Sequence, residues 1–269
     1  MLHPTVRWLG LVTAAALGFS AAAGRLADPA TGFSERPIGT QSVSAAMAEQ
    51  CVQFFRDKNF GGDMTQISEV TAKTAWDGHS FETKSKHFSS VRWNLPRGVI
   101  VTLFAGPDCT GKCMSVWGSG EVAELSTWKM NDDLAGWSWN YIGGVAEPSK
   151  TLKNGMSERP KYAKVAEGVQ EDSLHLFKNR DVKGEPQLLE HITDKPANTY
   201  QEMPKGISSL KWKLPEGVVV MFSEKADGVG PNLAIWGSAA GGSQFDTLAL
   251  WQMNDKLKYW SWQYVGEKK

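Results

Sequence analysis

The sequence predicts an all-β protein built from two copies of one module. Three observations predict this fold class. A long stretch of the chain recurs further along at a nearly constant offset. The apolar segments are short, alternate with polar residues and are bounded by Gly and Pro. Apart from the first residues, no segment keeps a 3.6-residue apolar period over three turns. Short strands at this spacing are typical of a sandwich or a barrel.

The duplication is clearest where 88–101 matches 207–220, at an offset of 207 − 88 = 119 residues. Later in the chain 137–143 matches 260–266, at an offset of 260 − 137 = 123 residues. The four extra residues are expected in the Gly- and Ala-rich segment Ala239–Ser243. Ten of the 12 Trp residues form five pairs under this alignment: Trp93/Trp212, Trp117/Trp236, Trp128/Trp251, Trp137/Trp260 and Trp139/Trp262. Chance does not align them in this way, so the chain is internally duplicated.

The chain therefore divides into a leader and two modules. Arg7, the apolar residues after it and the small-residue site Ala21–Ala23 predict a secretory signal peptide. The alternative is a buried N-terminal helix, although the segment carries no amphipathic stripe. The predicted boundaries are: signal peptide 1–23, flexible leader 24–49, first module 50–146, linker 147–171, second module 172–269.

Composition excludes two classes of partner. The 29 basic and 29 acidic side chains give a formal net charge of +0. A protein that grips a nucleic-acid backbone or an anionic membrane usually carries an excess of basic residues. We therefore expect a secreted monomer with no nucleic-acid partner and no membrane span once the signal peptide is removed.

Three cysteines, Cys51, Cys109 and Cys113, are too few for a disulfide framework. In an exported protein Cys109 and Cys113 could close a small disulfide ring, which would leave Cys51 unpaired. A zinc site is the alternative, but neither a second Cys pair nor a His-x-x-x-His motif supports it.

The local pattern places the strands. The segments 98–104 and 217–222 are β-branched runs that follow Pro and Gly, and 91–95, 137–142 and 174–177 alternate apolar and polar residues. All five are therefore expected to be strands. Short helical turns are expected near 126–130 and 247–253.

A weaker repeat lies within each module. A large residue, an apolar or bulky residue five positions later and a Gly two positions after that occur in three places: Phe55, Phe60 and Gly62; Phe104, Cys109 and Gly111; Phe177, Val182 and Gly184. A fourth copy is blurred, with Phe222 followed by Gly228 and Gly230. An aromatic ring can cover a folded hairpin while Gly adopts the positive φ that the bend needs.

A Ser-Ser-Val-Arg type segment ends the first half of the module, and an Asn-Asp loop precedes the last strand. In this order the motifs resemble those of the βγ-crystallins. The resemblance covers about 51–145 and 173–266. It implies two domains, each a sandwich of two intercalated four-stranded Greek keys. Neither this fold nor any motif in the chain suggests an enzyme, because no nucleophile elbow, zinc-protease motif or phosphate loop is present.

In many microbial members of that family, the two keys of a domain exchange ligands for Ca²⁺. One loop gives a carboxylate, and the other gives a hydroxyl and a main-chain carbonyl, which are oxygen ligands that suit calcium. Here each key keeps half of the motif, because Lys86 and Lys205 stand where an acid is expected. The resemblance thus implies one weak calcium site per module: Asp132 with Ser89 and the His87 carbonyl, and Asp255 with Ser208 and the Gly206 carbonyl.

Other interpretations remain open. Lys86–Asp132 and Lys205–Asp255 could be simple ion pairs across a loop. The functional expectation is a non-enzymatic structural or binding role with an extracellular protein or glycan as partner. The first alternative is a proteinase inhibitor or toxin-like effector, acting through Ala239–Ser243 or the loop between Cys109 and Cys113. The second is a glycan-binding module with Trp rings as the platform, although Trp at alternate strand positions favours a role in the core.

Overall fold

The chain is described here from a computed structural model, which covers residues 36–42, 47–75, 77–81, 87–142 and 159–265. The predicted signal peptide lies outside the described residues. In these ranges the regular structure is β-strand with short 3-10 turns, as the sequence predicts. No helix among the described residues is long and apolar enough to cross a membrane.

The first unit is a sandwich of two antiparallel four-stranded sheets, in the orders β2-β1-β4-β7 and β3-β8-β5-β6. Each sheet takes one strand from the other half of the unit, because β3 precedes β4 in the chain and β7 follows β6. This exchange intercalates the two Greek keys. The strands are β1 (Cys51–Phe55), β2 (Met64–Ile67), β3 (His79–Ser80), β4 (Ser90–Asn94), β5 (Val99–Phe104), β6 (Cys113–Trp117), β7 (Ser119–Val122) and β8 (Gly136–Tyr141).

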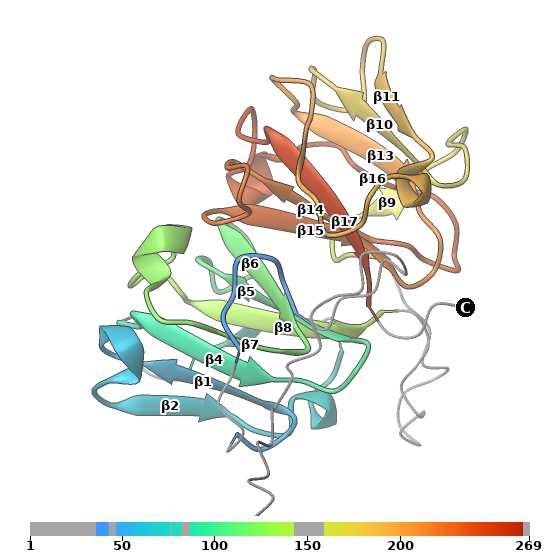
Figure 1. Ribbon diagram of the computed structural model, residues 1–269. Coiled ribbons are helices and arrows are strands. Elements are labelled where there is room, and N and C mark those ends of the chain that lie inside the picture. The colour runs from blue at the N-terminus through green and yellow to red at the C-terminus, as the bar shows by residue number, and fades with distance from the viewer. Residues whose placement is uncertain (1–35, 43–46, 76, 82–86, 143–158, 266–269) are drawn as a thin grey trace, which may run out of the picture.

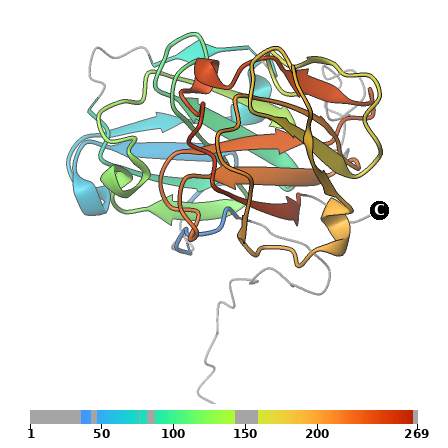
Figure 2. The same cartoon turned by 90° about the horizontal axis from the view of Figure 1, so that it is seen from above.

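The second unit repeats the arrangement, with sheet orders β11-β10-β13-β16-β9 and β12-β17-β14-β15. Figure 1 shows it beside the first unit, and seen from above it lies over that unit (Figure 2). Its strands are β9 (Lys164–Val165), β10 (Ser173–Phe177), β11 (Gln187–Glu190), β12 (Gln201–Glu202), β13 (Ser209–Lys213), β14 (Val218–Ser223), β15 (Asn232–Trp236), β16 (Ser243–Phe245) and β17 (Tyr259–Tyr264). The predicted all-β fold of two Greek-key sandwiches is therefore confirmed.

Short 3-10 turns connect the strands. The two that the sequence predicts near 126–130 and 247–253 are η3 (Leu125–Trp128) and η5 (Ala249–Trp251). The others are η1 (Lys58–Phe60), η2 (Val70–Ala72) and η4 (Ile192–Asp194).

Glycine shapes the hairpins as the motif predicts. Gly62, Gly111, Gly184 and Gly230 all have positive φ, between 73° and 109°. In the first hairpin the rings of Phe55 and Phe60 pack edge to face, with centroids 5.7 Å apart. The aromatic and glycine positions therefore mark hairpins that L side chains could not close without strain.

The cores of the two units are built from equivalent residues. Trp93 is fully buried and its Nε1 donates to the Trp117 carbonyl at 3.0 Å. Its counterpart Trp212 makes the same bond to the Trp236 carbonyl, also at 3.0 Å. Each ring fills the space between the sheets while its only donor is satisfied, as a buried indole requires.

A third apolar cluster joins the two units. It contains counterparts from both of them: Ile100 and Val219, Trp117 and Trp236, and Ile142 and Val265. Because equivalent residues meet, the interface has approximate twofold symmetry, which is the pattern of an isologous contact. The β6 and β15 strands lie at this boundary (Figure 1), where Cys113 Sγ contacts the Asn232 carbonyl oxygen at 3.3 Å.

Two segments expected to lie outside the modules contribute to the fold. In the predicted leader, Gln41 forms an isolated antiparallel bridge with Glu121 of β7. In the predicted linker, Lys164 and Val165 form β9, the edge strand beside β16. Polar segments of two or three residues carry no periodic signal, so their pairing could not be foreseen from local pattern.

Candidate calcium loops

In the first unit the structure brings the Asn-Asp loop against the segment that precedes β4. The backbone N–H of Asp132 donates to the Phe88 carbonyl at 3.1 Å, and Asp132 has a positive φ of 57°. The Asp132 side chain is about half exposed, and its Oδ1 lies 3.8 Å from His87 Nδ1. The half-buried Ser89 follows directly in this segment. The three predicted positions of this loop pair are therefore neighbours.

The second unit repeats this geometry. The backbone N–H of Asp255 donates to the Ile207 carbonyl at 3.0 Å, and Asp255 has a φ of 59°. The Ser208 hydroxyl donates to Asp255 Oδ1 at 3.4 Å. Gly206 comes two residues before Ser208, with a φ of 76°. A carboxylate and a hydroxyl thus point toward one another from the two keys of the unit.

A pair of amide oxygens at the same loops was not anticipated from the sequence. Asn131 Nδ2 donates to Asp132 Oδ2 at 2.5 Å, and Asn254 Nδ2 donates to Asp255 Oδ2 at 2.7 Å. The Oδ1 atoms of both Asn side chains are buried without a hydrogen-bond partner. Most buried oxygens in proteins accept a hydrogen bond, so these two atoms are places where a water or an ion would fit. The sequence shows the same Asn-Asp pair in both units, but it carries no signal for the burial of the Asn oxygens.

Each candidate calcium loop pair offers few carboxylates. Among the described residues no three His, Cys, Asp or Glu side chains gather as they would around a metal. Each candidate site would therefore depend on one carboxylate together with neutral oxygens, a set that suits a hard cation and not zinc.

The structure bears on only one of the two lysine–aspartate ion pairs considered above. Lys205 is exposed, and within the described part of the chain no ion pair joins it to Asp255. Lys86 lies outside the described residues. At Asp132 the neighbouring cationic group is the ring of His87, which is charged only when protonated.

The disulfide ring expected between Cys109 and Cys113 is not formed. All three cysteines are free and buried. Cys109 and Cys113 line a cavity of about 30 Å³ at the boundary of the two units, together with Lys161 and Tyr162. Burial raises the pKa of the Cys113 thiol to about 12, and burial also raises that of Cys109, against the opposing effect of Lys161.

The surfaces invoked for the alternative functions are largely covered. All ten paired Trp residues are buried, with at most 5% of any of them exposed. The loop between Cys109 and Cys113 packs on the second unit, where Gly111 N–H donates to the Leu250 carbonyl at 2.6 Å. In the Ala239–Ser243 segment only the first two residues are exposed, because Gly242 and Ser243 are buried beside the 159–166 segment. The paired Trp rings therefore offer no exposed platform for a glycan, whereas Thr110, Gly111 and Lys112 of the Cys109–Cys113 loop stay partly exposed.

Comparison with known proteins gives structural likenesses only. No protein-family profile matches the chain, and no curated protein is similar to it in sequence. Solved structures similar to it include βγ-crystallin domains. The βγ-crystallin from Ciona intestinalis is 17% identical with a TM-score of 0.25, and the match covers 33% of this chain and 96% of that one. A Clostridium beijerinckii βγ-crystallin domain is 15% identical with a TM-score of 0.26, covering 34% and 97%. Protein S, solved in complex with calcium, is 15% identical with a TM-score of 0.28, covering 81% and 99%.

Proposed function

We propose that the protein is a secreted, non-enzymatic structural protein whose two modules each bind one Ca²⁺ weakly. The first site uses Asp132, Ser89 and the His87 carbonyl, with Asn131 Oδ1 added. The second uses Asp255, Ser208 and the Gly206 carbonyl, with Asn254 Oδ1 added. Calcium would cross-link the two keys of each module, so the bound ion would stabilise the sandwich.

The single observation that carries this proposal is the same in both modules. Next to an Asp carboxylate that faces the neighbouring key, an Asn amide oxygen is buried without a donor. Two equivalent loops with the same unpaired oxygen support a shared ligand that accepts oxygen atoms. Ca²⁺ takes carboxylate, amide, hydroxyl and main-chain oxygens together, so the donor set fits this ion.

The expected affinity is low. Calcium sites gain affinity with the number of charged ligands and with rigidity, and each site here has one carboxylate. Sites of extracellular modules with few charges have dissociation constants on the order of 10⁻⁴–10⁻³ M. At a calcium concentration 100 times the dissociation constant, an ion that binds only the folded state adds about 2.7 kcal/mol.

The test is a calcium titration followed by the melting temperature. The wild-type chain should melt at a higher temperature as calcium rises into the millimolar range. Asp132→Asn and Asp255→Asn should each remove part of this increase, and the double variant should remove all of it. Isothermal calorimetry should then count two sites in the wild type and one in each single variant.

A matched control is Asp133→Asn. Asp133 follows Asp132, but its carboxylate pairs with Lys112. This variant should change the baseline melting temperature and keep the full calcium-induced increase. A wild-type melting temperature that is unchanged at about 10 mM calcium, roughly ten times the dissociation constant of the weakest sites, would refute the calcium proposal and leave the fold intact.

A further inference from the structure

The repeated unit begins earlier in the chain than the Greek-key modules. Gly32, Ser34, Glu35, Arg36 and Pro37 recur as Gly155, Ser157, Glu158, Arg159 and Pro160, at an offset of 160 − 37 = 123 residues. This is the offset found at the end of the repeat. The duplication therefore includes an arm in front of each module, whose described parts are 36–42 (arm one) and 159–165 (arm two).

Each arm docks on its own module at the same place. In arm one, Gln41 pairs with Glu121 of β7 through two backbone hydrogen bonds of 3.2 Å. In arm two, Lys164 pairs with Gln244 of β16. Both pairs are related by the same offset, because 164 − 41 = 123 and 244 − 121 = 123. The arms thus cover the edge strands of equivalent sheets, which would otherwise present unpaired backbone groups.

Both arms make the same turn before they pair. The third residue after Arg is Gly39 in arm one and Tyr162 in arm two, with φ of 79° and 68°. Positive φ is natural for Gly and unusual for Tyr. The turn is therefore maintained in arm two by contacts of the Tyr side chain.

At this turn each arm contacts the opposite module. The Tyr162 hydroxyl donates to the carbonyl of Asp108, in the β5–β6 hairpin of the first unit, at 2.6 Å. A methyl group added at Gly39 would lie 3.3 Å from the carbonyl oxygen of Asp227 and 3.2 Å from Val229 Cγ2, in the β14–β15 hairpin of the second unit. Asp108 and Asp227 are counterparts, since 227 − 108 = 119.

The contacts to the arms' own modules are also equivalent. The Tyr162 ring packs edge to face on Trp251 of its own unit, with centroids 6.3 Å apart. A Cβ added at Gly39 would lie 3.9 Å from Cζ2 of Trp128 in its own unit. Each arm therefore lies between the Trp of its own module and the Asp hairpin of the other.

From these reciprocal contacts we propose that the arms are a pair of clasps that fix the two modules to each other. Each clasp is anchored by strand pairing on one module and closes on the hairpin tip of the other. The role of the arm segment is thus to transmit stability between modules and to shield the cavity that Cys109 and Cys113 line.

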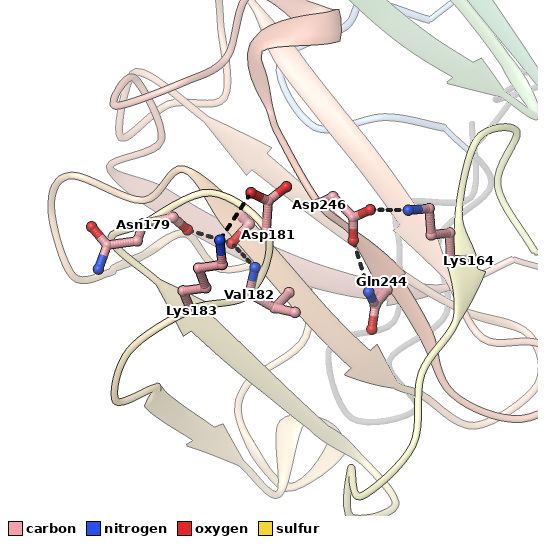
Figure 3. A network of polar contacts seen from close by, with 8 residues as sticks. Lys164, Asn179, Asp181, Val182, Lys183, Gln244 and Asp246 are labelled. Atoms are coloured by element: carbon pink, nitrogen blue, oxygen red, sulfur yellow. Dashed lines mark hydrogen bonds and ion pairs between the residues drawn. The ribbon is translucent and has the colours of Figure 1, made fainter.

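Arm two has an additional anchor. Figure 3 shows Lys164 reaching from β9 to the Asp246 carboxylate, which also accepts a hydrogen bond from Gln244 at 2.7 Å. The corresponding positions in the first unit are Gln41 and Ala123, which cannot form an ion pair. The Asp181 N–H donates to the Asp246 carbonyl at 2.7 Å, as the Asn59 N–H donates to the Ala123 carbonyl at 2.9 Å in the first unit, so only the ion pair is special to arm two. Arm two is therefore the more firmly held clasp.

The clasps can be tested by hydrogen exchange of the full-length chain, because each arm should protect the opposite module. Tyr162→Ala removes the bond to Asp108 and should speed exchange of the amides in 105–112 of the first unit. The loss of one hydrogen bond corresponds to roughly a two- to tenfold faster exchange. Tyr162→Phe keeps the ring on Trp251 and removes only the hydroxyl, so it should give a smaller increase in exchange rate at the same amides. This variant keeps the test valid if Tyr162→Ala folds poorly.

The reciprocal variant is Gly39→Val, which should speed exchange in 224–230 of the second unit because the new side chain meets Val229 and the Asp227 carbonyl. Val165→Ala is the matched control, since Val165 belongs to arm two and is 63% exposed. It should leave exchange in 105–112 unchanged. If Tyr162→Ala and Tyr162→Phe accelerate exchange only in the second unit, within 159–166 and 243–246, the arms serve their own modules alone and the proposal is overturned.

Discussion

Cys113 and Asn232 hold the same position in the two modules, since 232 − 113 = 119, and they contact each other. The Cys113 thiol donates to the Asn232 carbonyl at 3.3 Å, and Asn232 Oδ1 accepts the N–H of Ser115, also at 3.3 Å. Both side chains are almost completely buried. Because two counterparts meet at the boundary, the approximate twofold axis of the chain passes close to this contact.

Asn232→Ala should destabilise the protein by about 1–3 kcal/mol, because it leaves the buried Ser115 N–H without its acceptor across the boundary. The free energy of unfolding in urea measures this loss. Cys113→Ala is the comparison, since it removes only a weak thiol donor and keeps the Asn232–Ser115 bond. An equal loss in both variants would contradict the role assigned to the Asn side chain.

The thiols should be inert in the folded protein. Burial raises the pKa of Cys113 to about 12 and raises that of Cys109, so both stay protonated at pH 8. The reactive species is the thiolate. Cys51 is inaccessible because it is buried, so a chromogenic thiol reagent should find none of the three thiols in the native state and all three in denaturant without reductant. A single reactive thiol in denaturant would mean that Cys109 and Cys113 are joined as a disulfide.

The ion pair between Lys129 and Glu224 should make the association of the modules sensitive to acid. Lys129 Nζ lies 2.5 Å from Glu224 Oε2, and this hydrogen bond lowers the pKa of Glu224 below its usual 4.5. A lowered pKa stabilises the folded state above the unfolded value, and the contribution disappears as the pH falls through the folded value. Because Lys129 is half exposed, solvent limits the contribution to about 0–1 kcal/mol.

Glu224→Gln should thus lower the free energy of unfolding slightly at pH 7 and have little effect at pH 3. Urea titrations at the two pH values test this, and added salt should narrow the difference at pH 7. The same deficit at both pH values would show that the effect of Glu224 is not electrostatic.

Tyr200 and Gly228 should be energetically coupled. A Cβ at Gly228 would lie 2.5 Å from the Tyr200 ring, so Gly228→Cys should destabilise the second unit by about 1–3 kcal/mol through overpacking. The counterparts in the first unit are Gly78 and Cys109, where the small and large residues are exchanged. Tyr200→Gly should therefore partly rescue Gly228→Cys, with a coupling of about 0.5–3 kcal/mol in a double-mutant cycle. Strict additivity would be evidence against this packing exchange.

The same exchange explains why the fourth hairpin motif was indistinct in the sequence. Strand register shows that the counterparts of Phe104 and Cys109 are Ser223 and Gly228, and not residues aligned from Phe222. The Tyr200 ring comes from a distant part of the chain and occupies the space beside Gly228. A local motif cannot reveal such a partner, whereas the Gly with positive φ is a local requirement and was predicted in all four hairpins.

The candidate calcium loops were also predictable only in part. The placement of Asp132 and Asp255 near the Ser-Ser segments followed from the resemblance, and the structure shows both Asp residues bonded to those segments. Their role as calcium ligands stays a prediction. The unpaired oxygens of Asn131 and Asn254 were not foreseeable, because the burial of a single atom depends on packing around it. The arms escaped prediction because their strands are too short to show a period.

The way the modules meet also limits what the chain can assemble into. Each unit uses the same surface, around Trp117 in one and Trp236 in the other, to cover its counterpart. A self-complementary contact of this kind is closed once two partners have met, whereas a head-to-tail contact would leave a free end for further growth. In the described part of the chain both copies of this face are buried against each other, so the duplication pairs the two surfaces within a single chain.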